Sequence, residues 1–454
     1  MSFAPNTPFS ALFFTPLTYF SPFKAKFIFN IISSILLTIS VFRLSQYVKL
    51  VSWKVIIIPI IFFIPIINNL CFGQVYFLIL FLIIEGYLAF KNNKLIAMSI
   101  FWSFAIFIKI FPLILVLLLI INKKGKGILF LFLSCLMLLG GSILIQGTEV
   151  WSFYLNEVLS RSNRGEIAGL FVDNYQSFFM LCKRLLVFDR CNNHLPFFNA
   201  PELVAYFYTF FKIFIIGLTS FLIYKNIKNK DLKTTFSLGI ILLSSYLIPA
   251  YSSSYGLLVL IPITIFILGD FTHKRVLIPL LLVLFIGLNF GSLFITFEIY
   301  LFRYIRLFIL LTVLLVLIWN KVNFKSVSKI FILSCLLAFI GFSFETPKET
   351  SNIRCENLPL LIFDYDLKKN GISYSYWTNE GIKYGKTNII LNDEIIQKQT
   401  PAIIDNQIYI GNSQITYYQS SKRKAQWLDK NTIIYLSDEG KGIGFYGIKT
   451  MRLR

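Results

Sequence analysis

No aspartate or glutamate occurs before Glu85 in this chain of 454 residues. Charged residues of both signs make up only 14% of it, whereas a soluble domain has about 25%. This shortage excludes a soluble globular protein, because too few charges are present to cover a water-facing surface. The two histidines and six cysteines show no metal-ligand spacing. We therefore expect no metal site and no cofactor.

Long apolar runs take the place of charge. Hydrophobic residues amount to 56% of the chain, and a membrane-spanning helix needs about 20 of them in succession. The runs fall at 27–45, 55–67, 75–90, 95–122, 128–145, 203–224, 236–250, 256–268, 276–296, 299–319 and 328–344. They predict an α-helical multi-span membrane protein with about a dozen buried segments.

The net charge of +21 is concentrated in short basic clusters between these runs. Up to residue 344 the chain has 28 basic and 10 acidic residues, against 15 and 12 from residue 345 onward. Basic loops of this kind are typical of the cytoplasmic side of a membrane and do not indicate nucleic-acid binding. We predict a membrane domain at 1–344 and a separate domain at 345–454.

The run at 95–122 is interrupted in its middle by Lys109 and Pro112. Proline breaks the helix hydrogen-bond ladder, and a charge within the membrane is rare unless it lines a cavity. All basic clusters face the cytoplasm only if this segment enters and leaves on one side. We therefore predict a re-entrant hairpin of two helices, 95–108 and 111–121, with Lys109 near the external face.

Residues 359–454 alternate apolar and polar side chains in short runs, which is typical of strands. The clearest runs are 388–391, 407–410, 414–418 and 432–436, with turns at 411–412 and 438–440. We predict a small all-β domain on the external side. Its aromatic residues suit either sugar stacking or a core; they include Tyr374, Tyr376, Trp377 and Trp427.

The predicted topology places several polar segments on the external side. They are 68–74, Lys109, the 146–202 loop and 249–255, which ends at Tyr255. Each alone has an ordinary explanation as a turn, an interfacial lysine or a loop. Together they supply cations that suit a phosphate, and amides and hydroxyls that suit a sugar. In the same loop, Cys182 and Cys191 are candidates for a disulfide.

Several short motifs resemble glycosyltransferase family 87. They are Gly73-Gln74-Val75 at the start of an apolar helix, Lys109-x-x-Pro112, and Asn174-x-Gln176-Ser177 followed by Arg184. The segment from Pro8 to Leu17 resembles the part of the family that follows its first external loop. The resemblance runs from about residue 5 to residue 265 and leaves 345–454 uncovered.

This resemblance implies a GT-C type membrane fold in the cell (inner) membrane. Such enzymes transfer mannose or arabinofuranose from a polyprenyl-phosphate donor to a lipid-linked or glycan acceptor outside the membrane. Carried over by position, Lys109 and Arg184 face the donor phosphate, while Gln74, Asn174 and Gln176 bind sugar or shape the cavity. Membrane lipids, the donor and the acceptor are the expected partners, with Tyr255 a further substrate-binding residue.

The chain departs from the family in its acidic residues. The family usually carries its catalytic acid in an external loop before the segment with which this chain begins. We expect that the start is missing, that the base comes from elsewhere, or that the chain is inactive. Asp173 is the best external carboxylate by position, and Glu166 and Glu298 are weaker candidates.

Two other interpretations stay open. A transporter or flippase for a lipid-linked glycan is one, although the break at Lys109 has no clear counterpart in the second half. A non-catalytic subunit that binds envelope glycan through its β domain is the other.

Overall fold

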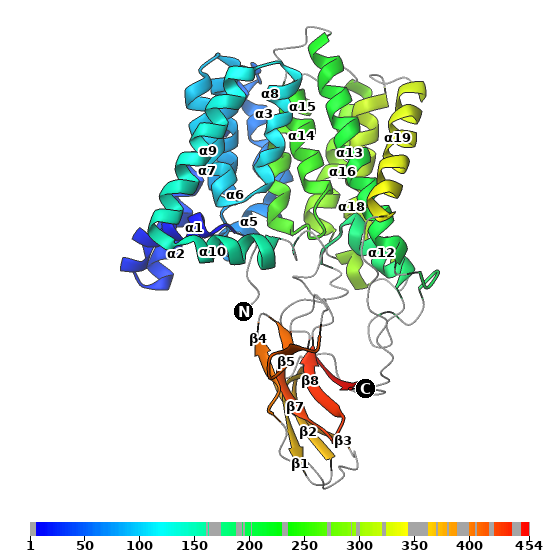
Figure 1. Ribbon diagram of the computed structural model, residues 1–454. Coiled ribbons are helices and arrows are strands. Elements are labelled where there is room, and N and C mark those ends of the chain that lie inside the picture. The colour runs from blue at the N-terminus through cyan, green and yellow to red at the C-terminus, as the bar shows by residue number, and fades with distance from the viewer. Residues whose placement is uncertain are drawn as a thin grey trace.

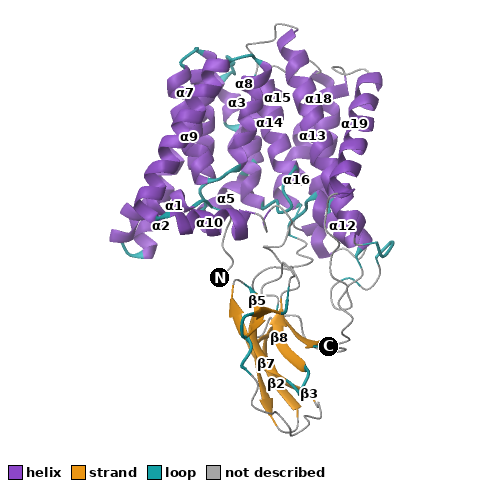
Figure 2. Ribbon diagram, in the orientation of Figure 1, coloured by secondary structure: helices purple, strands orange, loops and turns teal. Residues whose placement is uncertain are grey.

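The computed structural model shows a helical body and a group of strands (Figures 1 and 2). It describes residues 6–159, 162, 174–187, 193, 196–200, 202–228, 235–269, 274–291, 293–296, 300–319, 324–343, 362–368, 371–378, 381–387, 399–404, 406–416, 422–437 and 446–453. The α-helices of the first half are α1 (Pro8–Phe14), α2 (Pro22–Tyr47), α3 (Ser52–Val55), α4 (Ile57–Ile61), α5 (Phe63–Cys71), α6 (Tyr76–Lys91), α7 (Leu95–Ile108), α8 (Val116–Ile121), α9 (Gly125–Gln146) and α10 (Thr148–Phe153). Those of the second half are α12 (Phe178–Leu186), α13 (Glu202–Lys228), α14 (Phe236–Leu247), α15 (Ile261–Gly269), α16 (Lys274–Phe290), α17 (Tyr300–Arg303), α18 (Ile305–Trp319) and α19 (Phe324–Ser343). Shorter helical turns are η1 (Thr15–Tyr19), η2 (Phe111–Leu115), η3 (Tyr154–Leu159), η4 (Ser254–Leu260) and η5 (Leu293–Thr296).

Three helices of the described residues are long and apolar enough to cross a membrane. They are α2, α9 and residues 203–228 of α13. The pair Ser52–Ile61 and Phe63–Cys71 makes a fourth if it counts as one span, bent by 62°. The chain is therefore mostly helical and a membrane protein, as predicted, while the count of about a dozen segments stays a prediction.

The bend between α4 and α5 is completed by a side chain from α16. Pro65 has no N–H to offer the carbonyl of Ile61, four residues earlier. Asn289 Nδ2 donates to that carbonyl at 2.8 Å, and its Oδ1 accepts from the N–H of Ile64 at 2.8 Å. One amide thus satisfies both backbone groups that the bend releases, as the apolar interior of a membrane requires.

The 95–122 segment breaks where the sequence predicts. Helix α7 ends at Ile108, Lys109 is extended, and η2 begins at Phe111. The hydroxyl of Thr7 donates to the carbonyl of Phe107, one of those that the break leaves without a helical partner. At the other end, Lys124 Nζ donates to Asn93 Oδ1 at 2.9 Å, so the turn before α7 lies beside the turn after α8. The segment therefore enters and leaves on one face of the helical body.

That face carries the basic turns, and we call it the basic face. The start of α3 lies beside the end of α15, because Lys54 Nζ donates to the carbonyl of Leu268 at 2.8 Å. Both helices lie toward the same end of the helical body as α8 (Figure 1). The opposite face, here the site face, gathers the polar turns. Three hydrogen bonds join its parts: Asn68 to Ser254 at 2.8 Å, Ser177 to the carbonyl of Ala250 at 2.5 Å, and Gln146 to the carbonyl of Pro8 at 2.9 Å. Helices α1 and α10 lie along this side, and the strands lie beyond it (Figure 1).

The C-terminal region is all β, as predicted. Its strands are β1 (Ile362–Lys368), β2 (Gly371–Thr378), β3 (Gly381–Thr387), β4 (Ala402–Ile404), β5 (Gln407–Ile410), β6 (Ser413–Gln414), β7 (Lys422–Trp427), β8 (Thr432–Ser437) and β9 (Gly447–Arg452). They form three antiparallel sheets of three strands each, in chain order. The runs predicted at 407–410 and 432–436 are strands, whereas 388–391, 417–418 and 438–440 lie outside the described residues.

Strand β8 is buried on both of its faces. Ile434 and Leu436 pack in one core with residues of β1 and β2. Ile433 and Tyr435, which point to the opposite side, pack in a second core with Ile408 of β5. The sheet of β7, β8 and β9 therefore lies between the other two sheets. Trp427 belongs to the second core, so it is a core residue rather than a sugar-stacking one.

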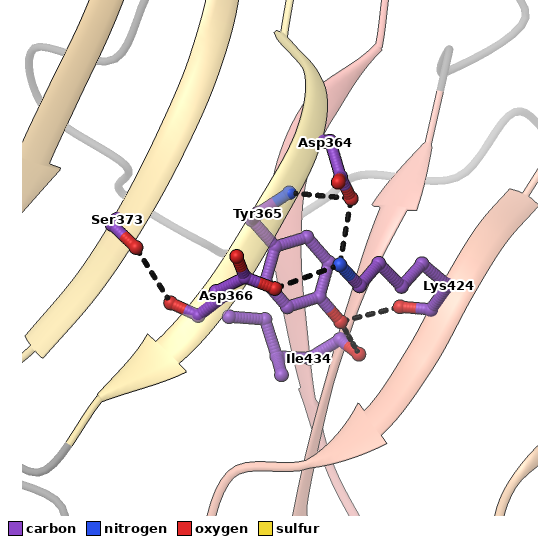
Figure 3. A network of polar contacts seen from close by, with 6 residues as sticks. All are labelled: Asp364, Tyr365, Asp366, Ser373, Lys424 and Ile434. Carbon is purple, nitrogen blue, oxygen red and sulfur yellow. Dashed lines mark hydrogen bonds and ion pairs between the residues drawn. The ribbon is translucent and has the colours of Figure 1, made fainter.

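A network of polar contacts joins β1 to β7 (Figure 3). The ammonium of Lys424 lies 2.7 Å from Asp364 and 3.1 Å from Asp366. Burial works to lower the pKa of Lys424, but the hydrogen bonds to both carboxylates outweigh it and raise the pKa. Between these carboxylates, the hydroxyl of Tyr365 donates to the carbonyl of Lys424 and, at 3.0 Å, to that of Ile434. Burial, and then the charge of Asp364, raise the pKa of Tyr365, so this donor stays protonated at neutral pH.

Removing the Tyr365 hydroxyl is expected to loosen the β region. Tyr365→Phe keeps the ring in the core but leaves two carbonyls without this donor, which costs about 1–3 kcal/mol. Limited proteolysis of the full chain should then cut within 362–453 sooner than in the wild type. Tyr384→Phe is the matched control, because Tyr384 is 82% exposed. Equal cleavage rates for the two variants would show that the Tyr365 hydroxyl does not stabilise the β region.

Candidate functional site

The turn that carries Gln74 is the end of helix α5. Gly73 adopts the left-handed conformation with φ of +58°. The N–H of Gln74 donates to the carbonyl of Asn69 at 2.9 Å, and that of Gly73 to the carbonyl of Leu70 at 3.2 Å. This pair of bonds is a Schellman motif, which ends a helix and satisfies its last carbonyls. The ordinary turn interpretation is therefore correct for the backbone, and it leaves Gln74 half-buried at the start of α6.

Lys109 lies against the first residue of α6. Its Nζ donates to the hydroxyl of Tyr76 at 2.9 Å and lies 4.4 Å from the centre of that ring. The Tyr76 ring is stacked on Phe111 at 5.9 Å and contacts Tyr255 with centroids 5.5 Å apart. The structure thus brings Lys109 and Tyr255 together, with Gln74 two residues away from their shared partner.

The cluster continues through the 249–255 turn. The Ser253 side chain lies beside the Tyr76 hydroxyl, and the Tyr246 hydroxyl donates to the carbonyl of Ser253 at 3.1 Å. Gly256 allows this close approach. A Cβ there would lie 3.3 Å from the Tyr246 ring and 3.4 Å from the hydroxyl of Tyr76. Tyrosines from α6, α14 and η4 therefore share one small volume.

Arg306 adjoins this cluster and was not predicted from the sequence. Its side chain lies beside the Tyr246 hydroxyl, and its Nε donates to the carbonyl of Gly287 at 3.4 Å. The residue is only 3% exposed. An arginine inside the apolar run 299–319 was a usable signal, because ionisable residues within membrane segments are rare and usually functional.

Gln176 positions Arg306. Its Oε1 accepts from the N–H of Arg306 at 2.8 Å, and its Nε2 donates to the carbonyl of Gly291 at 2.7 Å. Both ends of this buried amide thus contact backbone, which favours a role in shaping the site over contact with a sugar. The next residue, Ser177, caps helix α12 by accepting from the N–H of Met180 at 3.2 Å.

The other described residues proposed from the motifs are not part of the contacts around Tyr76. Asn174 is exposed in a turn, and Arg184 is buried in α12. The carboxylates Asp173, Glu166 and Glu298, and also Cys191, lie outside the described residues. Cys182 is a buried free thiol, and the predicted disulfide involves Cys191, which lies outside the described residues.

Glu85 does not serve this site. It lies about 14 Å beyond Tyr76 along α6, at about 1.5 Å per residue. Its carboxylate is paired with Arg43 at 2.6 Å and accepts from the Ser40 hydroxyl at 2.8 Å. Glu85 therefore joins α6 to α2 toward the basic face.

Among the described residues, two positive charges of the site have no counter-charge. Within the part of the chain that the structure describes, no carboxylate forms an ion pair with Lys109 or Arg306. Hydroxyl groups of Tyr76, Ser253 and Tyr246 lie between the two cations. Because an uncompensated buried charge costs several kcal/mol, this arrangement suits an anionic ligand that also accepts hydrogen bonds.

The comparisons with known proteins agree with the motifs. The sequence profile of glycosyltransferase family 87 matches residues 4–248. The matched part contains Gln74, Lys109, Gln176 and Tyr246, and it ends before Tyr255 and Arg306. No curated protein and no solved structure is detectably similar to the chain.

Proposed function

Because the chain belongs to glycosyltransferase family 87, we propose that it transfers a sugar from a polyprenyl-phosphate donor to a lipid-linked or cell-envelope glycan acceptor. The observation that carries the donor class is the placement of Lys109. A half-buried lysine without a carboxylate partner among the described residues, held against Tyr76 and Tyr255, suits the phosphate of a membrane lipid. A lipid-linked glycan carries a phosphate too, so the family match, rather than this lysine, favours transfer over the transporter interpretation.

In this proposal the phosphate is the leaving group. The acceptor hydroxyl oxygen forms a bond to the anomeric carbon of the donor while the bond from that carbon to the phosphate oxygen breaks. A carboxylate takes the hydroxyl proton, and Asp173 is our candidate for it. Lys109 stabilises the negative charge that develops on the departing polyprenyl phosphate. Arg184 is a further cation for this phosphate, and Gln74 and Asn174 are candidate sugar ligands.

The distribution of charge supports an orientation in the membrane. Basic turns gather on one face of the helical body and the tyrosine cluster lies at the other, so the positive-inside rule assigns the basic face to the cytoplasm. The 95–122 hairpin is then re-entrant with Lys109 near the external side. The strands of 362–453 lie outside the cell membrane, which is the inner membrane in a two-membrane envelope.

Cysteine labelling with an impermeant reagent tests this orientation. In a background free of the native cysteines, single cysteines at Gln74, Asn174 and Thr400 should react from outside in intact cells. Those at Lys94 and Lys124 should react only after the membrane is opened. External reaction at Lys124 without reaction at Lys94 would make 95–122 a single span and remove the hairpin from the account.

The sugar is determined by analysing the product. Purified protein is incubated with polyprenyl-phosphate mannose or polyprenyl-phosphate arabinofuranose, together with membrane glycolipid as acceptor. Mass spectrometry should show one glycolipid gaining a single hexose or pentose. No glycolipid gaining mass with either donor would contradict the proposal.

A further inference from the structure

Arg306 has the properties of a buried cation that binds an anionic ligand. Its guanidinium is buried and has five N–H donors; Nε donates to the carbonyl of Gly287, and the Tyr246 hydroxyl lies beside the group. No carboxylate of the described residues pairs with it. Buried arginines are normally neutralised by an acid, and none of the described residues supplies one here.

The backbone adds to the same positive potential. Arg306 is the second residue of α18, and the N-terminal end of a helix carries a partial positive charge. Gln176 neutralises none of it, because an amide that accepts from the N–H of Arg306 brings no net charge. The amide thus fixes the start of α18 while keeping the site positive.

A continuous set of contacts joins this charge to Lys109. The Arg306 side chain lies beside the hydroxyl of Tyr246, which donates to the carbonyl of Ser253. The Ser253 side chain lies beside the hydroxyl of Tyr76, which accepts from Lys109. Arg306 is therefore buried on the inner side of the tyrosines, whereas Lys109 is half-buried at their edge. In a medium of low dielectric constant, a charge in such a position acts on a ligand without touching it.

We infer that Arg306 is the second positive charge of the anion site and favours the phosphate of a polyprenyl lipid over its neutral alcohol, acting from behind Tyr246. The inference rests on the proposed function, because it assigns the ligand of the same site. Arg306 lies outside the part of the chain that matches the family. It is a positioning residue here, and Lys109 remains the group that contacts the phosphate.

A pair of lipid probes isolates the effect of charge. Binding of a short-chain polyprenyl phosphate and of the corresponding polyprenol is measured on the full-length purified protein. Arg306→Gln should weaken phosphate binding by about 10- to 100-fold and leave polyprenol binding unchanged. Arg306→Lys should restore most of the difference. Arg423→Gln, at an exposed position in β7, is the control and should change neither affinity.

A second variant covers the possibility that Arg306→Gln does not fold. Gln176→Glu keeps an oxygen that accepts from the N–H of Arg306, loses the donor to Gly291 and adds a negative charge near Arg306. Phosphate binding should therefore fall while polyprenol binding persists. Unchanged phosphate binding in the folded variants, or an equal loss for both lipids, would overturn the inference. If the wild-type protein itself fails to prefer polyprenyl phosphate to polyprenol, the proposed donor class fails first.

Discussion

Lys109→Met is expected to abolish sugar transfer while the protein stays inserted and folded. Methionine keeps the length and apolar stem of lysine, so contact with the ring of Tyr76 persists, but the charge next to the leaving phosphate is lost. Removing a group that stabilises developing charge typically lowers the turnover number by about 10²- to 10³-fold. The measurement is the initial rate of transfer from polyprenyl-phosphate sugar by purified protein at saturating donor.

Lys126→Met is the matched control for this prediction. Lys126 is exposed on the basic face, at the start of α9, and should tolerate the same change without loss of rate. Wild-type turnover by the Lys109 variant would show that this lysine only extends its charge to the membrane interface.

Asp173→Asn is expected to lower transfer by about 10²- to 10⁴-fold, the usual contribution of a positioned general base. Asparagine has the shape of aspartate but cannot accept the proton of the acceptor hydroxyl. The effect should appear in the turnover number, while the affinity for the donor lipid changes little. Asp173 stands next to Asn174 in the motif that the family match includes.

Glu149→Gln is the control for the base. Glu149 is an exposed acid in the first turn of α10, on the side of the site face. It should be replaceable without effect. Full activity of Asp173→Asn would remove Asp173 from the mechanism and direct the search to Glu166 and Glu298.

Local signals in the sequence were enough for the breaks and turns. Pro112 has no N–H for the helix ladder, and a lysine in the middle of an apolar run is rare unless it lines a cavity, so the two together indicate a break. The alternation in β5 likewise indicates the period of a strand, and the short apolar run of β8 is typical of a strand that is buried on both faces. The polar strand β7, by contrast, could not be recognised, because its burial depends on the sheets that pack against it.

Only those parts of the site that have a local signal in the sequence were predicted. Lys109 and Tyr255 lie in segments that the charge pattern assigns to one side of the membrane, and the structure joins them through Tyr76. Tyr246 looks like any core residue of an apolar helix. Its pairing with Arg306, sixty residues later, arises only when α14 packs against α18.

Transfer from a purified donor tests the central claim most directly. The protein in detergent is given glycolipid acceptor and a radiolabelled sugar carried either on polyprenyl phosphate or on a nucleotide. Label should move to the acceptor only from the polyprenyl-phosphate donor, with release of one polyprenyl phosphate for each sugar transferred. Equal or better transfer from the nucleotide sugar, or none from the lipid donor, would contradict the account.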